Sequence, residues 1–328
     1  MYKEKQKKIL SVVTPVYNEE ENIGEFYSRV LKATQDLNLE LEIIYINDGS
    51  HDNTIEIINR QSEKDNRIAV LDLSRNFGKE IALTAGLDYA TGDAVIVIDS
   101  DLQDPPEVIP ELVKKWRDGN DVVNARRIKR KGEGFLKKIT SHIYYRLLFF
   151  ISDIKIPMDT GDFRLLNRNA LDAISQLREK HRFMKGLFAW VGFKQQEIQY
   201  EREARFKGKT KWSFFGLFNL AFDGLTSFSI MPLRLASTVG FLSALFGFFY
   251  GVTIVIKKIF FHEPVVGFTS LVVLVTFFGG IQLLSIGIIG EYIGRIFNET
   301  KNRPLYIVKN IKESVFSNKS YYELTYIV

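Results

Sequence analysis

The chain has 328 residues, with 44 lysines and arginines against 39 aspartates and glutamates, and it contains no cysteine. The length suits one large α/β domain plus a membrane segment, and the lack of a Gly/Ser- or Pro-rich linker argues against further independent modules. Disulfides and cysteine-based metal sites are excluded, and four histidines without ligand spacing predict no zinc centre. Basic residues concentrate in Arg126–Lys138 and Arg202–Lys211, which suits anionic lipid headgroups or phosphorylated ligands; we expect no nucleic-acid partner.

Short β-rich runs alternate with helical stretches through the first 125 residues, which predicts a mostly parallel, doubly wound sheet covered by helices. The expected strands are Ile9–Val16, Leu41–Ile46, Ile68–Leu73, Ala94–Asp99 and Asp121–Ala125. The expected helices are Glu20–Leu37 after an N-cap at Asn18, Asp52–Ser62, Lys79–Ala90 and Glu107–Arg117. Ligands of such sheets bind beyond the carboxyl ends of the strands.

Two carboxylates, Asp99 and Asp101, follow the fourth expected strand, with Gln103 and Asp104 close behind. Two hard oxygen ligands fit Mg²⁺ or Mn²⁺, which would take its remaining ligands from water and a diphosphate. An isolated Asp-x-Asp is more often a solvated turn, but the position at a strand end favours a metal site.

The segment after the second strand, Asn47-Asp48-Gly49-Ser50, suits both a turn with Ser50 as a helix cap and a nucleoside contact by Asp48. Nucleotide fingerprints of other classes are absent. No Gly-x-Gly-x-x-Gly follows the first strand, and Gly208-Lys209-Thr210 lacks the first glycine of a P-loop because Glu203 stands there.

Two uncharged apolar runs, Leu235–Ile256 and Pro264–Gly290, are long enough to cross a bilayer. The first apolar stretch, Ile9–Val16, is too short for a secretory signal, so we expect a cytoplasmic domain on the inner membrane. Helical spacing of apolar residues predicts interfacial helices at Phe135–Ser152 and Trp212–Ile230. The basic residues after the second run agree with a cytoplasmic C-terminus; they are Arg295, Lys301, Arg303 and Lys309. Two lysines between the runs, Lys257 and Lys258, do not agree with it.

Together these segments resemble the family 2 glycosyltransferases of the GT-A fold, in the branch of dolichol-phosphate mannose synthase and the bacterial polyprenyl-phosphate glucosyltransferases of the GtrB type. The resemblance covers nearly the whole chain. It depends on Val13-Thr14-Pro15-Val16-Tyr17-Asn18-Glu19-Glu20, Asn47-Asp48-Gly49-Ser50, Arg75-Asn76-Phe77-Gly78-Lys79, Asp99-Ser100-Asp101-Leu102-Gln103-Asp104-Pro105-Pro106-Glu107, Gly161-Asp162-Phe163-Arg164-Leu165, and His181-Arg182-Phe183 with Gly186. Asn47 and Ser100 depart from residues common in the family, Asp and Ala, without removing a carboxylate that the assignment needs.

The resemblance implies a nucleotide-sugar pocket, a metal site and an acceptor site. The nucleotide-sugar residues would be Pro15, Tyr17, Glu19, Asp48, Lys79 and Asp99, and the metal residues Asp99, Asp101 and Gln103. Asp162 is the expected catalytic carboxylate, and Asp159 is the second choice. The segment Gly161–Arg164 would also suit a turn that enters a helix at Leu165–Leu177. The expected acceptor-phosphate ligands come from the available cations and are Arg126, Arg130, Arg164, Arg182 and Arg205; Arg127, Arg202 and Lys209 are further candidates.

The sequence therefore predicts a membrane-anchored, metal-dependent inverting transferase that moves a hexose from a nucleotide sugar to polyprenyl phosphate. UDP-glucose is the preferred donor by similarity; GDP-mannose, UDP-galactose and a UDP-aminosugar stay open, as does self-association. The expected regions are a nucleotide-sugar and metal core at 1–134, an acceptor-side segment at 135–232, a membrane hairpin at 233–297 and a cytoplasmic tail at 298–328. The rivals are a processive polysaccharide synthase, which normally has more crossings and a Gln-x-x-Arg-Trp motif, and a non-catalytic nucleotide-sugar sensor.

Overall fold

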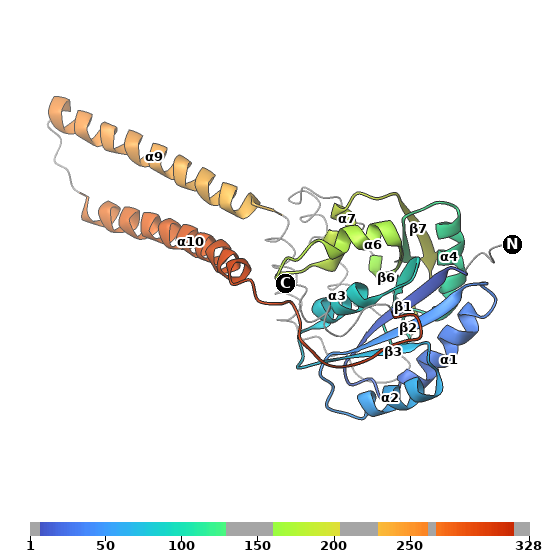
Figure 1. Cartoon of the computed structure of the whole chain (residues 1–328). Coiled ribbons are helices and arrows are strands. Elements are labelled where there is room, and N and C mark those ends of the chain that lie inside the picture. The colour runs from blue at the N-terminus through green and yellow to red at the C-terminus, as the bar shows by residue number, and fades with distance from the viewer. Residues whose placement is uncertain (1–6, 129–159, 204–228, 262–266, 318–328) are drawn as a thin grey trace.

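The computed structural model describes residues 7–128, 160–203, 229–261 and 267–317 (Figure 1). Several predictions concern residues outside these ranges. They are the site residues Asp159, Arg130 and Arg205, the rejected P-loop segment at 208–210, the interfacial helix predicted at 135–152, and residues 212–228 of the second predicted interfacial helix. The described chain forms an α/β domain from which two long helices extend (Figure 1).

One eight-stranded sheet organises the α/β domain, in the order β7-β5-β6-β4-β1-β2-β3-β8. The parallel pairs are β1 with β2, β1 with β4, β2 with β3, and β5 with β7. Strand β6 is antiparallel to β4 and β5, and β8 is antiparallel to β3. The strands are β1 (Ile9–Val16), β2 (Glu40–Asn47), β3 (Ile68–Leu73), β4 (Ala94–Val97), β5 (Val122–Arg127), β6 (Thr160–Asn167), β7 (Gln195–Tyr200) and β8 (Val308–Lys312).

Helices cover both faces of this sheet because side chains of successive strand residues point to opposite faces. Val12 and Ile43 pack on one face with α1 (Ile23–Thr34), α2 (Thr54–Lys64) and α4 (Ile109–Arg117), which follows the 3₁₀ turn Pro106–Val108. Val13 and Ile44 pack on the other with α3 (Lys79–Tyr89), α6 (Arg168–Ser175) and α7 (Met184–Trp190). The prediction of a covered α/β sheet is confirmed, with a mixed rather than mostly parallel strand pattern at its two ends.

Two local predictions are wrong. Asn18 is not a helix cap: it has a left-handed φ of 51°, and α1 begins only at Ile23. Its amide accepts from the backbone N–H of His51, 2.8 Å away, so Asn18 joins the loop after β1 to the loop after β2. Gly161–Arg164 is not a turn but the start of β6, and the following helix begins at Arg168, where the Asn167 side chain caps it through Ala170 N–H at 2.8 Å.

The described part of the segment predicted as a tail completes the α/β domain. Strand β8 pairs with the edge of β3, and the buried Tyr306 hydroxyl donates to Asp88 on α3 at 2.9 Å. Ser314 donates to the buried carboxylate of Glu42 on β2 at 2.7 Å. Residues 305–317 are therefore structural parts of the domain, although α10 separates them from it in the sequence.

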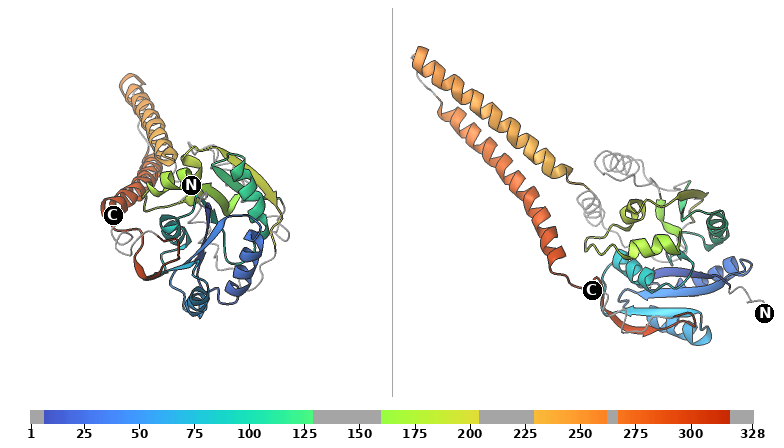
Figure 2. Two further views of the ribbon diagram at one scale, coloured as in Figure 1. Left: turned by 45° about the vertical axis from the view of Figure 1, so that its right-hand side comes forward. Right: turned by 45° about the horizontal axis from the view of Figure 1, so that its top comes forward.

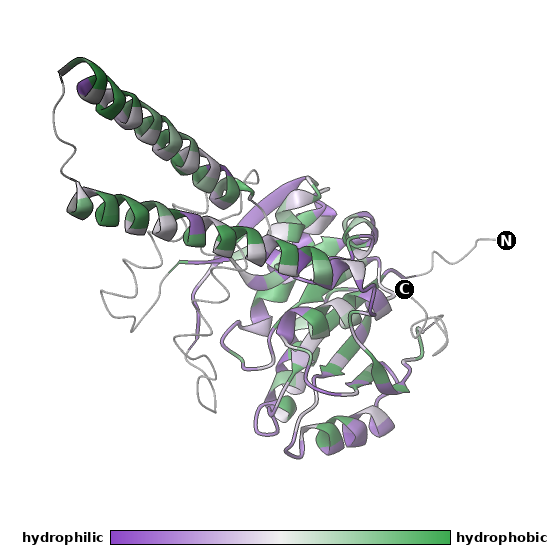
Figure 3. Cartoon of the chain, turned by 90° about the vertical axis from the view of Figure 1, so that its left-hand side faces the viewer, coloured by the Kyte–Doolittle hydropathy of each residue, from purple (hydrophilic) through white to green (hydrophobic). Residues whose placement is uncertain are grey.

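Two long helices, α9 (Met231–Phe261) and α10 (Phe268–Thr300), leave the domain side by side (Figure 2). Their candidate membrane spans, Met231–Lys257 and Ser270–Thr300, have mean hydropathies of 2.1 and 2.3, and many large apolar side chains on them are exposed. Figure 3 shows the hydrophobic residues along both helices. The second helix begins later than the predicted Pro264 and continues past Gly290. Its far end is fixed to the domain, because Lys180 N–H donates to Glu299 at 2.7 Å.

Since β8 follows α10 and pairs with β3, both ends of the hairpin must lie on the same side of a membrane that the hairpin spans. This agrees with the expectation that two crossings return the chain to the side of the α/β domain.

We predict that Tyr306→Phe destabilises the whole α/β domain, because it removes a hydrogen bond to the buried carboxylate of Asp88. The expected loss is about 1.5–3 kcal/mol in the free energy of unfolding, measured as a lower melting temperature in detergent. Tyr27→Phe is the matched control: its hydroxyl donates to Asp65 at 2.7 Å in a half-exposed position, where water replaces the contact. Equal melting temperatures for the two variants would show that residues 305–317 are not part of the folded domain.

Candidate active site

A pocket of about 270 Å³ lies at the carboxyl edge of the parallel strands. Every residue predicted for the nucleotide-sugar site lines it, and so does the predicted metal ligand Asp101. The lining residues are Pro15, Val16, Tyr17 and Glu19 after β1, Asp48 after β2, Asn76, Gly78 and Lys79 around the start of α3, and Asp99, Ser100 and Asp101 after β4.

Asp48 holds the loop that enters α3. Its two carboxylate oxygens accept from Phe77 N–H at 2.7 Å and Gly78 N–H at 3.0 Å. Gly49 beside it has φ +69°, and a Cβ there would lie 2.7 Å from the Asn76 nitrogen, so the close approach of the two loops requires glycine. Burial raises the pKa of Asp48, although both N–H groups counteract this. The structure thus gives Asp48 a loop-holding contact; its contact with a base or ribose stays a prediction.

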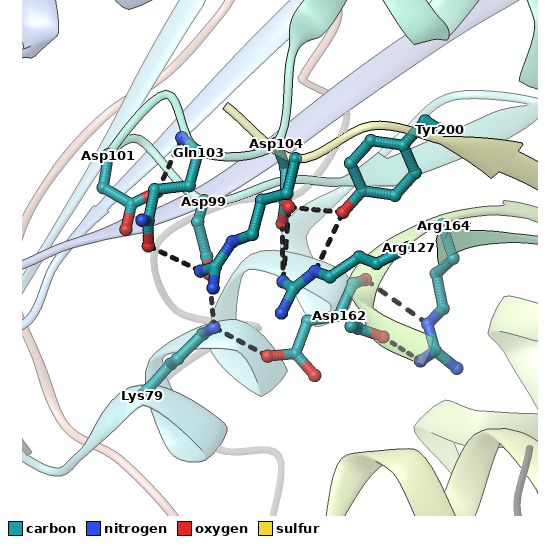
Figure 4. Close-up of polar contacts among 11 residues, drawn as sticks. Lys79, Asp99, Asp101, Gln103, Asp104, Arg127, Asp162, Arg164 and Tyr200 are labelled. Carbon is teal, nitrogen blue, oxygen red and sulfur yellow. Dashed lines mark hydrogen bonds and ion pairs between the residues drawn. The ribbon is translucent and has the colours of Figure 1, made fainter. Parts of the chain in front are cut away.

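Lys79 is the electrostatic centre of the site (Figure 4). Its ammonium donates to Asp99 at 2.7 Å and to Asp162 at 2.6 Å, joining α3 to the end of β4 and to β6. Burial alone would lower the pKa of Lys79, but the carboxylates of Asp162 and Asp99 raise it above its usual range. Lys79 therefore stays protonated and holds both carboxylates in place.

Asp162 is an ionised carboxylate with one engaged and one unengaged oxygen. Its Oδ2 accepts from Lys79, whereas Oδ1 is buried without a hydrogen-bond partner among the described residues. Burial would raise the pKa of Asp162, but the nearby Lys79, Lys185 and Arg164 outweigh that effect and hold it well below its usual range. A carboxylate with so low a pKa is a weak base and a persistent negative charge.

The loop after β4 gathers several carboxylates. Asp101 accepts from the backbone N–H of Gln103 at 3.1 Å, and the Gln103 amide oxygen accepts from Arg202 at 2.5 Å. Burial and the neighbouring Asp162, Asp104 and Asp101 raise the pKa of Asp99, although Lys79 opposes them. This excess of negative charge fits a divalent cation.

The described side chains supply only part of the coordination that such a cation needs. No group of three or more His, Cys, Asp or Glu side chains with metal-ligand geometry occurs within the described ranges. Asp99 and Asp101 supply the hard oxygens, so water and substrate diphosphate must complete the coordination, as Mg²⁺ sites commonly require.

A buried cluster behind this loop was not predicted (Figure 4). Arg127, at the end of β5, lies 3.2 Å from both carboxylate oxygens of Asp104 and donates to the Tyr200 hydroxyl at 3.0 Å. Tyr200, at the end of β7, donates in turn to Asp104. The sequence marked Asp104 and Arg127 by position, but nothing marked Tyr200, because its approach depends on the parallel pairing of β5 with β7.

The predicted acceptor arginines fall into different surroundings. Arg126 is 43% exposed and pairs with Glu197 at 3.2 Å. Arg164 is buried, donates to the Gly161 carbonyl at 2.8 Å and lies 4.0 Å over the Phe188 ring; Arg182 is buried and donates to the Leu177 carbonyl. The geometry favours packing roles for Arg164 and Arg182, and their contact with an acceptor stays a prediction.

The comparisons with known proteins decide the family. Residues 11–175 match the model of glycosyl transferase family 2, and residues 231–296 match the GtrB C-terminal hairpin. The chain belongs to glycosyltransferase family 2. This confirms the resemblance drawn from the motifs, and the hairpin match covers most of α9 and α10.

Similar members of this family cover almost the whole chain. The prophage bactoprenol glucosyl transferase homolog of Escherichia coli K12 is 47% identical over 93% of this chain and 99% of its own length. The bactoprenol glucosyl transferase of Shigella phage SfV has the same identity and coverage, and an uncharacterized Synechocystis glycosyltransferase, sll0501, is 48% identical over 92% and 95%. Glucosyl-3-phosphoglycerate synthase from Mycobacterium tuberculosis overlaps more weakly, with a TM-score of 0.45 and 22% identity over 65% of this chain and 76% of its own.

In this family 2 member, the geometry divides the site into two sides. Lys79 and Asp99 line the pocket, whereas Asp162, which Lys79 also contacts, does not. Lys79 thus joins a carboxylate that lines the pocket to one that does not.

We predict that Asp104→Ala destabilises the domain by about 3 kcal/mol, because it leaves the largely buried guanidinium of Arg127, whose side chain is 18% exposed, without its carboxylate. A fall in melting temperature measures the loss. Glu197→Ala, which breaks the half-exposed pair with Arg126, is the control and should cost less than about 1 kcal/mol. Similar effects of the two changes would contradict a structural role for the buried cluster.

Proposed function

We propose that this family 2 glycosyltransferase moves glucose from UDP-glucose to a polyprenyl phosphate at the cytoplasmic face of the inner membrane, with inversion at the anomeric carbon. The supporting observation is Lys79, which joins Asp99 at the nucleotide pocket to Asp162 outside it. The two candidate membrane spans and the relatives named bactoprenol glucosyl transferase support a lipid carrier as acceptor.

The pocket residues bind and orient the donor. Pro15, Tyr17 and Glu19 line the side formed after β1, and Asp48 keeps the opposite loop closed through Phe77 and Gly78. Asp99 and Asp101, with Gln103 nearby, would hold Mg²⁺ or Mn²⁺, which supplies neutralisation of charge on the leaving diphosphate. The leaving group departs toward this side of Lys79.

The acceptor attacks from the Asp162 side. A phosphate oxygen of the lipid forms the new bond to the anomeric carbon while the bond from that carbon to the diphosphate breaks, so an α-linked donor gives a β-linked product. The second pKa of a phosphate monoester is about 6, so the attacking oxygen carries its own charge at neutral pH. Asp162, a weak base, would then orient the acceptor or stabilise positive charge that develops at the anomeric carbon.

The rival functions have less support. A processive synthase normally has more crossings than the two candidate spans found among the described residues. A non-catalytic sensor would only need to bind the nucleotide sugar. It would not need an ionised Asp162 that is held 2.6 Å from Lys79. Among donors, GDP-mannose stays the alternative.

The proposal is tested by transfer of labelled sugar into organic-extractable lipid, with purified protein, polyprenyl phosphate and Mg²⁺ or Mn²⁺. We expect transfer from UDP-glucose and none from GDP-mannose. Asp99→Ala should lower turnover at least about 100-fold while the protein still inserts into membranes. Asp118→Ala, an exposed change on the far end of α4, is the matched control and should leave turnover unaltered. Transfer from GDP-mannose alone would overturn the donor, and full turnover of Asp99→Ala would overturn the metal site.

The pH dependence should follow the acceptor. The pKa of Asp162 lies below its usual range and that of Lys79 above, so neither charge changes between pH 5 and 8. We expect kcat/KM for polyprenyl phosphate to fall about tenfold from pH 8 to pH 5, as the phosphate dianion with a pKa of about 6 is protonated.

Glu80 is the control for this experiment, because burial and nearby Asp162 raise its pKa to about 7. In Glu80→Gln the acidic fall should persist at the same pH. Its disappearance would assign the titration to Glu80 instead of the acceptor.

A further inference from the structure

Lys185 is a cation beside Asp162 that the proposed chemistry has not yet used. Three cations act on Asp162 within the described chain: Lys79, Lys185 and Arg164. Lys79 is engaged by two carboxylates, and Arg164 is only 3% exposed and engaged by backbone carbonyls. Lys185 is half-buried and makes no ion pair within the part of the chain that the structure describes. It is therefore the cation that remains available to a ligand.

The position of Lys185 is fixed from two sides. The preceding residue, Met184, begins α7 and donates its backbone N–H to Glu80 at 3.1 Å, and Glu80 is the neighbour of Lys79 on α3. One turn later, Phe188 packs against the Arg164 guanidinium at 4.0 Å, and Arg164 is two residues from Asp162 on β6. Residues three apart share a helix face, so Lys185 and Phe188 both face β6.

The side of the site that holds Lys185 is not the nucleotide side. The pocket is lined by Asp99, Asp101 and Lys79, but neither Asp162 nor Lys185 lines it. Asp99 and Lys79 line the pocket, Asp162 contacts Lys79 from outside it, and Lys185 on α7 acts electrostatically on Asp162. A ligand of Lys185 would thus lie outside the pocket, on the Asp162 side of Lys79.

The same element meets the membrane hairpin. Lys180, in the loop before α7, donates its backbone N–H to Glu299 at the end of α10, and the His181 ring nitrogen lies 3.1 Å from the Asn298 amide. Lys185 follows this loop directly. The start of α7 therefore lies between the catalytic carboxylate and the end of a candidate membrane span.

A phosphate dianion needs a further cation to approach here. The divalent cation that Asp99 and Asp101 would hold neutralises charge on the diphosphate side, and Lys79 is shared by Asp99 and Asp162, so the Asp162 carboxylate would still repel an anionic acceptor. The half-buried ammonium of Lys185, which acts on Asp162 from a distance but forms no ion pair among the described residues, supplies the missing attraction.

We propose that Lys185 binds the phosphate of the lipid acceptor and places it beside Asp162. The inference rests on the proposed function and deepens it, because it names a residue for the acceptor side of the same site. Lys185 binds the attacking phosphate through its ammonium, and Glu80 acts as a positioning residue by holding the first turn of α7.

The test compares Lys185→Gln and Lys185→Arg with Lys194→Gln, an exposed lysine after α7. KM for polyprenyl phosphate is measured at saturating UDP-glucose, and the Kd for UDP is measured separately. Lys185→Gln should raise the acceptor KM at least about tenfold, as expected for loss of a charged hydrogen bond. Lys185→Arg should recover most of the affinity, and the Kd for UDP should not change in any variant.

Other outcomes overturn the inference. Weaker UDP binding by Lys185→Gln would place the lysine on the donor side. An unaltered acceptor KM, or an equal rise in Lys194→Gln, would show that Lys185 has no specific contact with the phosphate. If wild-type protein transfers no sugar from any donor, the proposed function fails; calorimetric binding of a short-chain prenyl phosphate in detergent then decides the inference, which requires weaker binding by Lys185→Gln than by wild type.

Discussion

The ion pairs of Lys79 with Asp99 and Asp162 are the constraint on which the rest of the site depends. Three separate elements, α3, the end of β4 and the start of β6, must converge for one ammonium to reach both carboxylates at 2.6–2.7 Å. The same contacts depress the pKa of Asp162 and keep Lys79 charged. One half-buried cation thus fixes the geometry and also decides which chemistry the carboxylate can perform.

Around that centre, the segments at the carboxyl edge are held by contacts with neighbouring loops, strand ends and helices. Asp48 closes the segment before α3, Gln103 and Asp104 join the loop after β4 to the ends of β5 and β7, and Glu80 fixes the start of α7. The site therefore combines Lys79 on α3 and Asp162 on β6 with side chains on short loops that are held by contacts with their neighbours.

The strands and the pocket residues were predictable where the local sequence pattern agrees with the final fold. Strands β1 and β3 match their predicted bounds residue for residue, because each is a short apolar run flanked by turn residues, and the nucleotide-pocket residues follow predicted strand ends. Strand β6 was missed because Leu166, Ala170 and Ile174 repeat at helical spacing; its strand conformation depends on pairing with β4 and β5. Lys185 and Tyr200 carry no local signal, since only tertiary approach brings them to the site.

Strand β8 gives the domain an unusual order of synthesis. The edge of β3 is covered by residues that the ribosome makes only after α9 and α10, so the sheet stays unfinished while the hairpin emerges. Uncovered strand edges are prone to wrong pairing. Entry of the hairpin into the bilayer would precede closure of the sheet, and the newly made protein would then complete its folding beside the membrane.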